Sequence, residues 1–419
     1  MFELLVLTAI VLTVVVAFLT RAIANPATLM MGTWAVVLTG LYVLRNDYLE
    51  LDVLPLAFLF GVSVVFSLSA LMAQGKVVRG AVRPPMQVEH AFRTVLVPFV
   101  LVSLAVVPFY VRQQLSVRGR SENVLFNIRE NSLDLGGSFF FDNFYLVVLV
   151  ASLFALYNYL SNRGLLNLLI YTLLMISGFA LAVFSGAKGE VINIFFASFI
   201  LYIMLNPRKQ VVASVLVGSS LFVALMAGLF YINLAADARS YDFDFVRLLA
   251  TDYVFGGTAA FSIYYNQIMD FQNQQTLLNA YASLLRAVGF LVPDFSIHYP
   301  FVNLYGYRYT NVYTWMFPII KQVGVVGAVA VVALLGGLAG ILYRVSNKSF
   351  AATCAYVVLS LSIVQSIFSD LFLYGSFRFL KLLVFIFLFN GLIIWTARYY
   401  SNRRRVAKRK QKNSVARIN

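Results

Sequence analysis

The chain has 419 residues, of which 61% are hydrophobic and only 12% are charged, and its net charge is +15. Soluble domains carry about 25% charged residues, so this composition excludes an ordinary soluble enzyme. Apolar runs long enough to cross a bilayer recur along the whole chain, which predicts an all-α polytopic membrane protein. The one cysteine, Cys354, has no partner for an intramolecular disulfide.

About eleven apolar runs are predicted to be transmembrane helices. They cover residues 2–20, 28–45, 51–73, 92–111, 139–160, 165–184, 191–205, 211–234, 322–343, 350–369 and 379–397. No basic residue precedes the first run and Arg21 follows it, which favours a retained helix over a cleaved signal peptide.

Charge predicts the orientation of these helices. The tail at 398–419 is strongly basic and is expected in the cytoplasm, so eleven helices place the N-terminus outside. The inner loops and the tail then hold 18 of the 32 Lys and Arg residues but only one acid, Glu89. The positive charge therefore indicates topology and contact with anionic lipid, and we expect no nucleic-acid partner.

Four regions follow from this topology. Residues 1–234 hold helices one to eight with a smaller outer loop at 112–138, residues 235–321 form a large outer loop, residues 322–397 hold the last three helices, and residues 398–419 form the tail. The outer loops are predicted to contain short amphipathic helices, such as 279–292. Long structured loops usually carry function.

Arginines in the large outer loop run against the positive-inside bias. Arg239, Arg247 and Arg308 either form ion pairs that hold the loop together or line an anion-binding cavity. Arg binds phosphate with two parallel hydrogen bonds, which would suit a diphosphate on a lipid carrier. His298 or Asp237 could accept a hydroxyl proton, although His298 could equally bond loop backbone.

Aromatic residues crowd the same loop. Tyr305, Tyr307 and Tyr309, with Asn311 beside them, suit either anchoring at the membrane interface or stacking on sugars. The acid-x-acid pair at 242–244 is a weak signal, so no metal site and no cofactor are predicted. The sequence contains no G-x-S-x-G, P-loop or G-x-G-x-x-G motif, so nothing supports a serine hydrolase or an ATPase.

The segment "VFSGAKGEVI" places Lys188 and Glu190 between two apolar runs. The run that follows, 191–205, is about 22 Å long as a helix and therefore shorter than the ~30 Å hydrocarbon layer. If its inner end is pinned by basic residues, its outer end is recessed, and Lys188 could hold a phosphate at a helix N-terminus. The alternative is a Lys188–Glu190 pair that caps a tight turn.

In "SGAKGEVI", in the long outer loop after the eighth run and in "YTNVYTWMFPIIKQVGVVGAVAVVALLGGLAGILYR", the chain resembles the O-antigen polymerase (Wzy) family. This resemblance implies a GT-C-like, metal-independent glycosyltransferase in the bacterial inner membrane. Such enzymes join undecaprenyl-diphosphate-linked oligosaccharides, donor to acceptor, on the periplasmic face. Lys188 stands where family members often have Arg.

The resemblance also implies site roles and partners. Lys188, Arg239, Arg247 and Arg308 would bind the diphosphate, Tyr305, Tyr307, Tyr309 and Asn311 would bind sugar, and His298 or Asp237 would be the general base. A chain-length regulator protein and a flippase would be partners. Two alternatives stay open, namely an O-antigen ligase and, from another class, a flippase or other transporter, which would place more ionisable residues within facing helices.

Overall fold

The computed structural model describes residues 1–75, 86–116, 139–185, 188–206, 243–270, 285, 289, 301–306, 308–310, 313–346, 348–367 and 375–415. Nine helices within these ranges are long and apolar enough to cross a membrane, and a tenth apolar helix, Gly189–Leu205, is shorter. This is the architecture of a helical multi-pass membrane protein, as expected. The run predicted at 211–234 lies outside the described residues.

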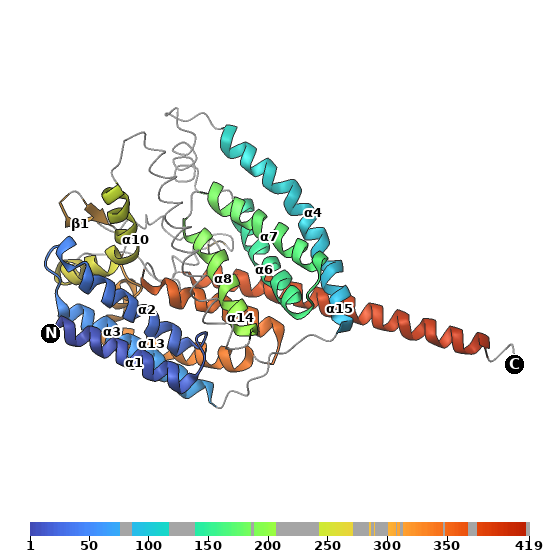
Figure 1. Cartoon of the computed structure of the whole chain (residues 1–419), viewed down its shortest axis with the longest axis horizontal. Coiled ribbons are helices and arrows are strands. Elements are labelled where there is room, and N and C mark those ends of the chain that lie inside the picture. Colours follow the sequence, from blue (N-terminus) through green and yellow to red (C-terminus); the bar gives the residue numbers. More distant parts are fainter. Residues whose placement is uncertain are drawn as a thin grey trace.

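Figure 1 shows the arrangement of the elements and labels most of them. They are α1 (Phe2–Thr20), α2 (Pro26–Val43), η1 (Arg45–Asp47), α3 (Val53–Gln74), α4 (Met86–Ser116), α6 (Phe139–Ser161), α7 (Leu165–Phe184), α8 (Lys188–Leu205), α10 (Phe243–Ile263), α11 (Tyr265–Asp270), β1 (Val302–Tyr305), β2 (Arg308–Thr310), α13 (Met316–Ser346), α14 (Phe350–Val364), η3 (Gln365–Ile367) and α15 (Ser376–Val415).

Two of the late helices are longer than the apolar runs predicted. α13 includes a helical segment from Met316 that was not predicted, and a kink at Gly324, where φ is 69°, separates it from the segment predicted to begin at 322. This backbone conformation favours glycine. α15 continues through the basic tail to Val415, because Arg, Lys and Gln are good helix formers once the apolar part has started the helix. In Figure 1 this extension projects away from the rest of the protein.

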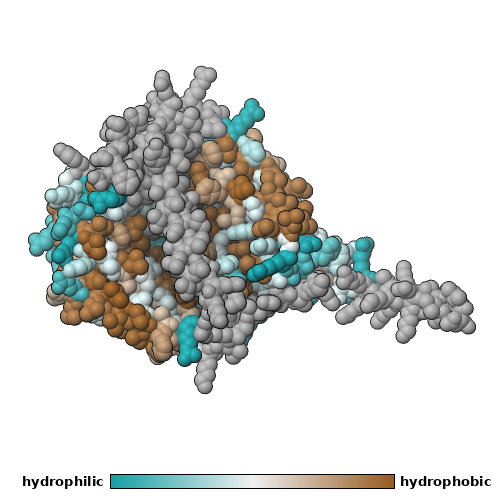
Figure 2. All heavy atoms as spheres, in the orientation of Figure 1, coloured by the Kyte–Doolittle hydropathy of each residue, from teal (hydrophilic) through white to brown (hydrophobic). Residues whose placement is uncertain are grey.

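Burial separates central helices from lipid-facing ones. In the apolar parts of α6 and α14, 78% and 83% of the residues are buried, whereas in α1 only 11% are. α1 exposes Leu4, Leu7, Val14 and Phe18. Figure 2 shows large hydrophobic areas on the outside of the helical body, as lipid contact requires.

The closest helix packing joins α3 and α13. A Cβ atom added at Gly336 would lie 2.3 Å from the carbonyl oxygen of Phe66, and one at Gly340 would lie 2.2 Å from that of Ala70. These two glycines are four residues apart and therefore share one face of α13. Small residues at this spacing let membrane helices approach until their backbones touch.

The region 235–321 differs from the prediction of short amphipathic helices on an outer surface. α10 has 21 residues and buries Thr258, Ala260 and Phe261 against α2 and α3. β1 and β2 form an antiparallel hairpin that pairs Val302 with Thr310. Tertiary packing explains the difference, because small residues in the middle of α10 allow the helix to lie directly on the body. Most of 112–138 and 279–292 lies outside the described residues.

Contacts between helix ends define two opposite faces. The Tyr42 hydroxyl donates to Glu3, which joins the end of α2 to the start of α1, and Asn25 donates to Gln74, which joins the start of α2 to the end of α3. We call the end that carries β1 and β2 the hairpin face. The opposite end is the tail face, with Arg21, Arg163 and Arg344 in or beside its helix ends.

Candidate functional site

Glu190 and Arg378 form the centre of a polar cluster near the hairpin face. Glu190 lies in the first turn of α8, and both of its carboxylate oxygens accept hydrogen bonds from the guanidinium of Arg378 near the start of α15. The Glu190 side chain is 17% exposed and that of Arg378 is 34% exposed. Glu190, which one interpretation of the sequence paired with Lys188, therefore binds an arginine far along the chain. The side chain of Lys188 lies outside the described residues.

Neutral polar groups complete this cluster. The Asn193 amide lies 3.4 Å from Glu190, and the oxygen of the same amide accepts a 2.5 Å bond from Gln365 in η3. The Tyr145 hydroxyl on α6 donates to the backbone oxygen of Glu190 at 2.7 Å. Side chains from α6, α8, η3 and α15 thus surround one ion pair. Their hydrogen bonds offset the free-energy cost of placing charged groups between apolar helices.

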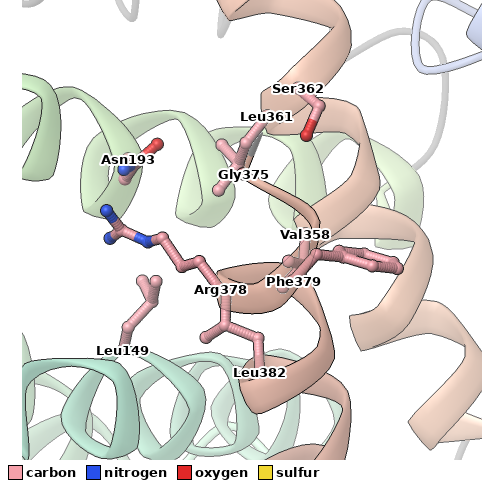
Figure 3. Close-up of a pocket in the computed structure, with 9 residues that line it drawn as sticks. All are labelled: Leu149, Asn193, Val358, Leu361, Ser362, Gly375, Arg378, Phe379 and Leu382. Atoms are coloured by element: carbon pink, nitrogen blue, oxygen red, sulfur yellow. The ribbon is translucent and has the colours of Figure 1, made fainter. Parts of the chain in front are cut away.

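A small cavity adjoins Arg378. Its volume is about 30 Å³, and it is lined by Leu149, Asn193, Val358, Ser362, Arg378 and Leu382, among others. Figure 3 shows Arg378 reaching from α15 toward Asn193, with Leu149 on the other side of the guanidinium. This space holds about one water molecule, so an anion larger than water does not fit in the cavity while Glu190 occupies the guanidinium.

Arg308 organises a second cluster on the hairpin face. Its Nε donates to Asp252 on α10 at 2.6 Å, Nη2 donates to the other oxygen of that carboxylate, and Nη1 donates to the Asp47 carbonyl at 2.5 Å. Its guanidinium also lies 4.9 Å from the centre of the Tyr48 ring. The Arg308 and Asp252 side chains are 11% and 12% exposed, so the pair is largely shielded from water.

The electrostatics of this cluster favour a charged arginine and a neutral tyrosine. Burial lowers the pKa of Arg308, but the hydrogen bond and the negative charge of Asp252 outweigh burial and raise it overall. Burial, followed by the charge of Asp252, raises the pKa of the Tyr48 hydroxyl. Arg308 thus fastens β2 to α10 and to the α2–α3 connection.

The other predicted residues fall into two groups. Arg247 is exposed on α10, and the rings of Tyr305 and Tyr309 are 53% and 59% exposed on the hairpin. Outside the described residues lie His298, Asp237, Arg239, Tyr307 and Asn311. Arg308 lies on the same hairpin as Tyr305 and Tyr309, and Glu190 at the start of α8 forms an ion pair with Arg378. The two clusters are connected through α10, which carries Asp252, and η3, which carries Gln365, because these two elements contact each other.

Sequence reasoning missed Arg378, Asn193 and Gln365. A signal for Arg378 was present, because an arginine at the edge of an apolar run is a functional candidate. No comparable signal existed for the two amides. Among the described residues, no three His, Cys, Asp or Glu side chains gather as metal ligands.

The fold is that of a helical multi-pass membrane protein, and the described residues include two ion pairs, Arg308–Asp252 and Arg378–Glu190, on the hairpin side. The chain matches no protein-family model, no curated protein and no solved structure.

Asp252→Asn is expected to release the hairpin from α10. The substitution leaves the shielded Arg308 without its carboxylate, which should cost about 3–5 kcal/mol. Limited proteolysis of the purified protein in detergent would measure this as faster cleavage between β1 and β2. Asp47→Asn is the matched control, because Arg308 hydrogen-bonds only the backbone carbonyl of Asp47. Equal cleavage rates in the two variants would contradict the assigned role of the ion pair.

Proposed function

We propose that this protein is a membrane glycosyltransferase that polymerises undecaprenyl-diphosphate-linked oligosaccharides on the periplasmic side of a bacterial inner membrane. The proposal rests on the resemblance to oligosaccharide repeat-unit polymerases, and the multi-pass helical fold is compatible with it. The hairpin face would be the periplasmic face, and it holds Arg247, Arg308 and Arg378.

The observation that supports the proposal most directly is the bidentate contact between Arg378 and Glu190. A diphosphate presents paired anionic oxygens, as a carboxylate does, and could replace Glu190 on the same guanidinium. Glu190 would then hold Arg378 in place until the lipid-linked substrate binds. Arg378 thus joins Lys188, Arg239, Arg247 and Arg308 as a candidate diphosphate ligand.

The reaction requires stabilisation of a leaving group. A hydroxyl oxygen of the incoming unit attacks the anomeric carbon of the growing glycan, and the bond from that carbon to the diphosphate oxygen breaks. Undecaprenyl diphosphate leaves with the bonding electrons, and guanidinium groups stabilise its developing charge. His298 or Asp237 would accept the hydroxyl proton. The exposed rings of Tyr305 and Tyr309 offer flat apolar faces for sugars.

A transporter of lipid-linked glycans is the second candidate. The network of Glu190, Arg378, Asn193 and Gln365 between apolar helices favours it, because ionisable residues in such positions often mark a substrate path. An O-antigen ligase would use the same diphosphate donor on the same face, with a different acceptor.

Reconstitution in liposomes tests the proposal. Purified protein supplied with undecaprenyl-diphosphate-linked repeat units is expected to make longer glycans, which gel electrophoresis would resolve. Arg239→Ala should abolish extension, whereas Arg45→Ala should retain it, since Arg45 is an exposed hairpin-face cation that stacks on Tyr42.

The alternatives predict different products. Translocation of the lipid-linked unit without extension would replace the polymerase assignment by a transporter, and transfer only to a lipid A-type acceptor would replace it by a ligase. In a deletion strain, a polymerase is expected to leave surface glycan of single-unit length. Complete loss of capped glycan would contradict that expectation.

A further inference from the structure

A polar cavity of about 400 Å³ opens on the tail face, at the opposite end from the clusters around Arg308 and Arg378. It lies between the ends of α1, α3 and α13, and its lining includes Thr20, Arg21, Asn25, Gln74, Gly75 and Tyr343. A polar hollow of this size at the edge of an apolar helix bundle has room for a headgroup-sized ligand.

Two arginines supply positive charge at this cavity. Arg21 lines it, and Nη1 of Arg344 lies 3.9 Å from the position that a Cβ atom on Gly75 would occupy. Both arginines are exposed, and within the described part of the chain neither guanidinium has an ion pair or a hydrogen bond. The cavity therefore has one guanidinium in its lining, that of Arg21, and a second beside Gly75, that of Arg344, and among the described residues no carboxylate neutralises either.

The backbone at Arg21 is a second, independent observation. Arg21 ends α1 in the left-handed conformation, with φ 48°, and its N–H donates to Ala17. It is the one non-glycine residue with positive φ among those described. Glycine usually occupies this position at a helix end, because it adopts the conformation without strain. Arginine therefore occupies this position at a cost in backbone strain that glycine would not carry.

Hydrogen-bond donors are also available. Asn25 caps α2 with its oxygen and donates its amide to Gln74 at 2.6 Å, so the oxygen of Gln74 is occupied while its own amide N–H groups are left as donors. Gly75 has no side chain to fill the space beside Arg344. Amide donors and guanidinium groups together suit a phosphate oxygen.

The surface beside the cavity favours a membrane lipid over free phosphate as its ligand. Phe18 and Leu19 on α1 and Met72 on α3 are 72%, 67% and 84% exposed. An acyl chain can lie along these residues while its headgroup enters the cavity. We propose that the cavity binds the phosphate headgroup of an anionic membrane phospholipid, with Arg21 and Arg344 as its cationic ligands. This site is independent of the activity proposed above.

Native mass spectrometry of the full-length protein tests the site. Protein in detergent would be titrated with phosphatidylglycerol or phosphatidylcholine, and bound lipids counted. The wild type is expected to retain one phosphatidylglycerol more tightly than phosphatidylcholine. Arg21→Gly and Arg344→Gln should each weaken that binding about fivefold.

Matched variants separate binding from folding. Arg21→Gly relieves the backbone strain, so its thermal stability without lipid should equal or exceed that of the wild type while binding falls. Arg163→Gln removes one exposed charge from the same face, away from the cavity, and should bind as the wild type does. Unchanged retention of phosphatidylglycerol by Arg21→Gly would overturn the proposal. Displacement of the lipid by millimolar inorganic phosphate would likewise overturn it, because the site would then be one for free phosphate.

Discussion

Adding one methyl group at Gly336 is expected to destabilise the protein by about 1–3 kcal/mol, as overpacking of a close contact does. The new Cβ would lie 2.3 Å from the carbonyl oxygen of Phe66. The end of a flexible side chain could rotate out of the way, but a backbone carbonyl within a helix cannot. α3 and α13 would have to separate. Gly340→Ala should act similarly through Ala70, and the double variant should be worse than either.

Gly337→Ala is the control for this prediction. It lies beside Gly336 on the same helix, and an added Cβ there has nothing within 4 Å. Because alanine favours a helix over glycine, this variant should be as stable as the wild type or slightly more so. Thermal unfolding in detergent, followed by size-exclusion chromatography, measures all of them. Equal unfolding temperatures for Gly336→Ala and Gly337→Ala would show that the α3–α13 contact is looser than described.

Replacing only one residue of the Glu190–Arg378 pair should lower the stability of the protein more than replacing both. Glu190→Gln or Arg378→Gln leaves a partly buried charge without a partner, at about 2–3 kcal/mol, less than for a fully buried pair because Arg378 is 34% exposed. In the double variant the two glutamines can hydrogen-bond each other, so stability should recover in part. The thermal unfolding temperatures of the four proteins measure this cycle.

Glycan extension by the same double variant tests function apart from folding. We expect no extension, because the guanidinium that would bind diphosphate is gone. The Glu89–Arg93 pair on the tail face is the control, since its side chains are exposed to a similar degree, 20% and 33%. Glu89→Gln combined with Arg93→Gln should retain extension. Normal extension by the Glu190/Arg378 double variant would remove Arg378 from the proposed site.

Local patterns predicted the helices well. The apolar runs starting at residues 2, 139 and 165 correspond to α1, α6 and α7 within two residues, because hydropathy and helix length are properties of neighbouring residues. The short run predicted at 191–205 corresponds to α8, which begins three residues earlier, at Lys188. The run predicted at 322–343 corresponds to the part of α13 that follows the kink at Gly324, whereas the helical turn that begins at Met316 before the kink was not predicted.

The partners of the charged residues could not be predicted from local patterns. Arg308 was predicted to face outward and bind an anion or form an ion pair, and the structure shows an ion pair with Asp252. A Lys188–Glu190 pair was one of two interpretations of the α8 start, and the structure shows a partner for Glu190 that neither of them named, Arg378, 188 positions away. Nothing in the sequence around either residue specifies such a distant partner.

By itself, the sequence determined the long apolar helices and the short apolar helix α8, and it predicts an excess of positive charge near one set of helix ends. Only the tertiary structure decided that α10 lies against the helical body, that Gly336 and Gly340 contact the backbone of α3, and which carboxylate each arginine binds. The reason is physical: hydrophobicity acts over neighbouring residues, whereas an ion pair or a backbone contact depends on which distant segments pack together.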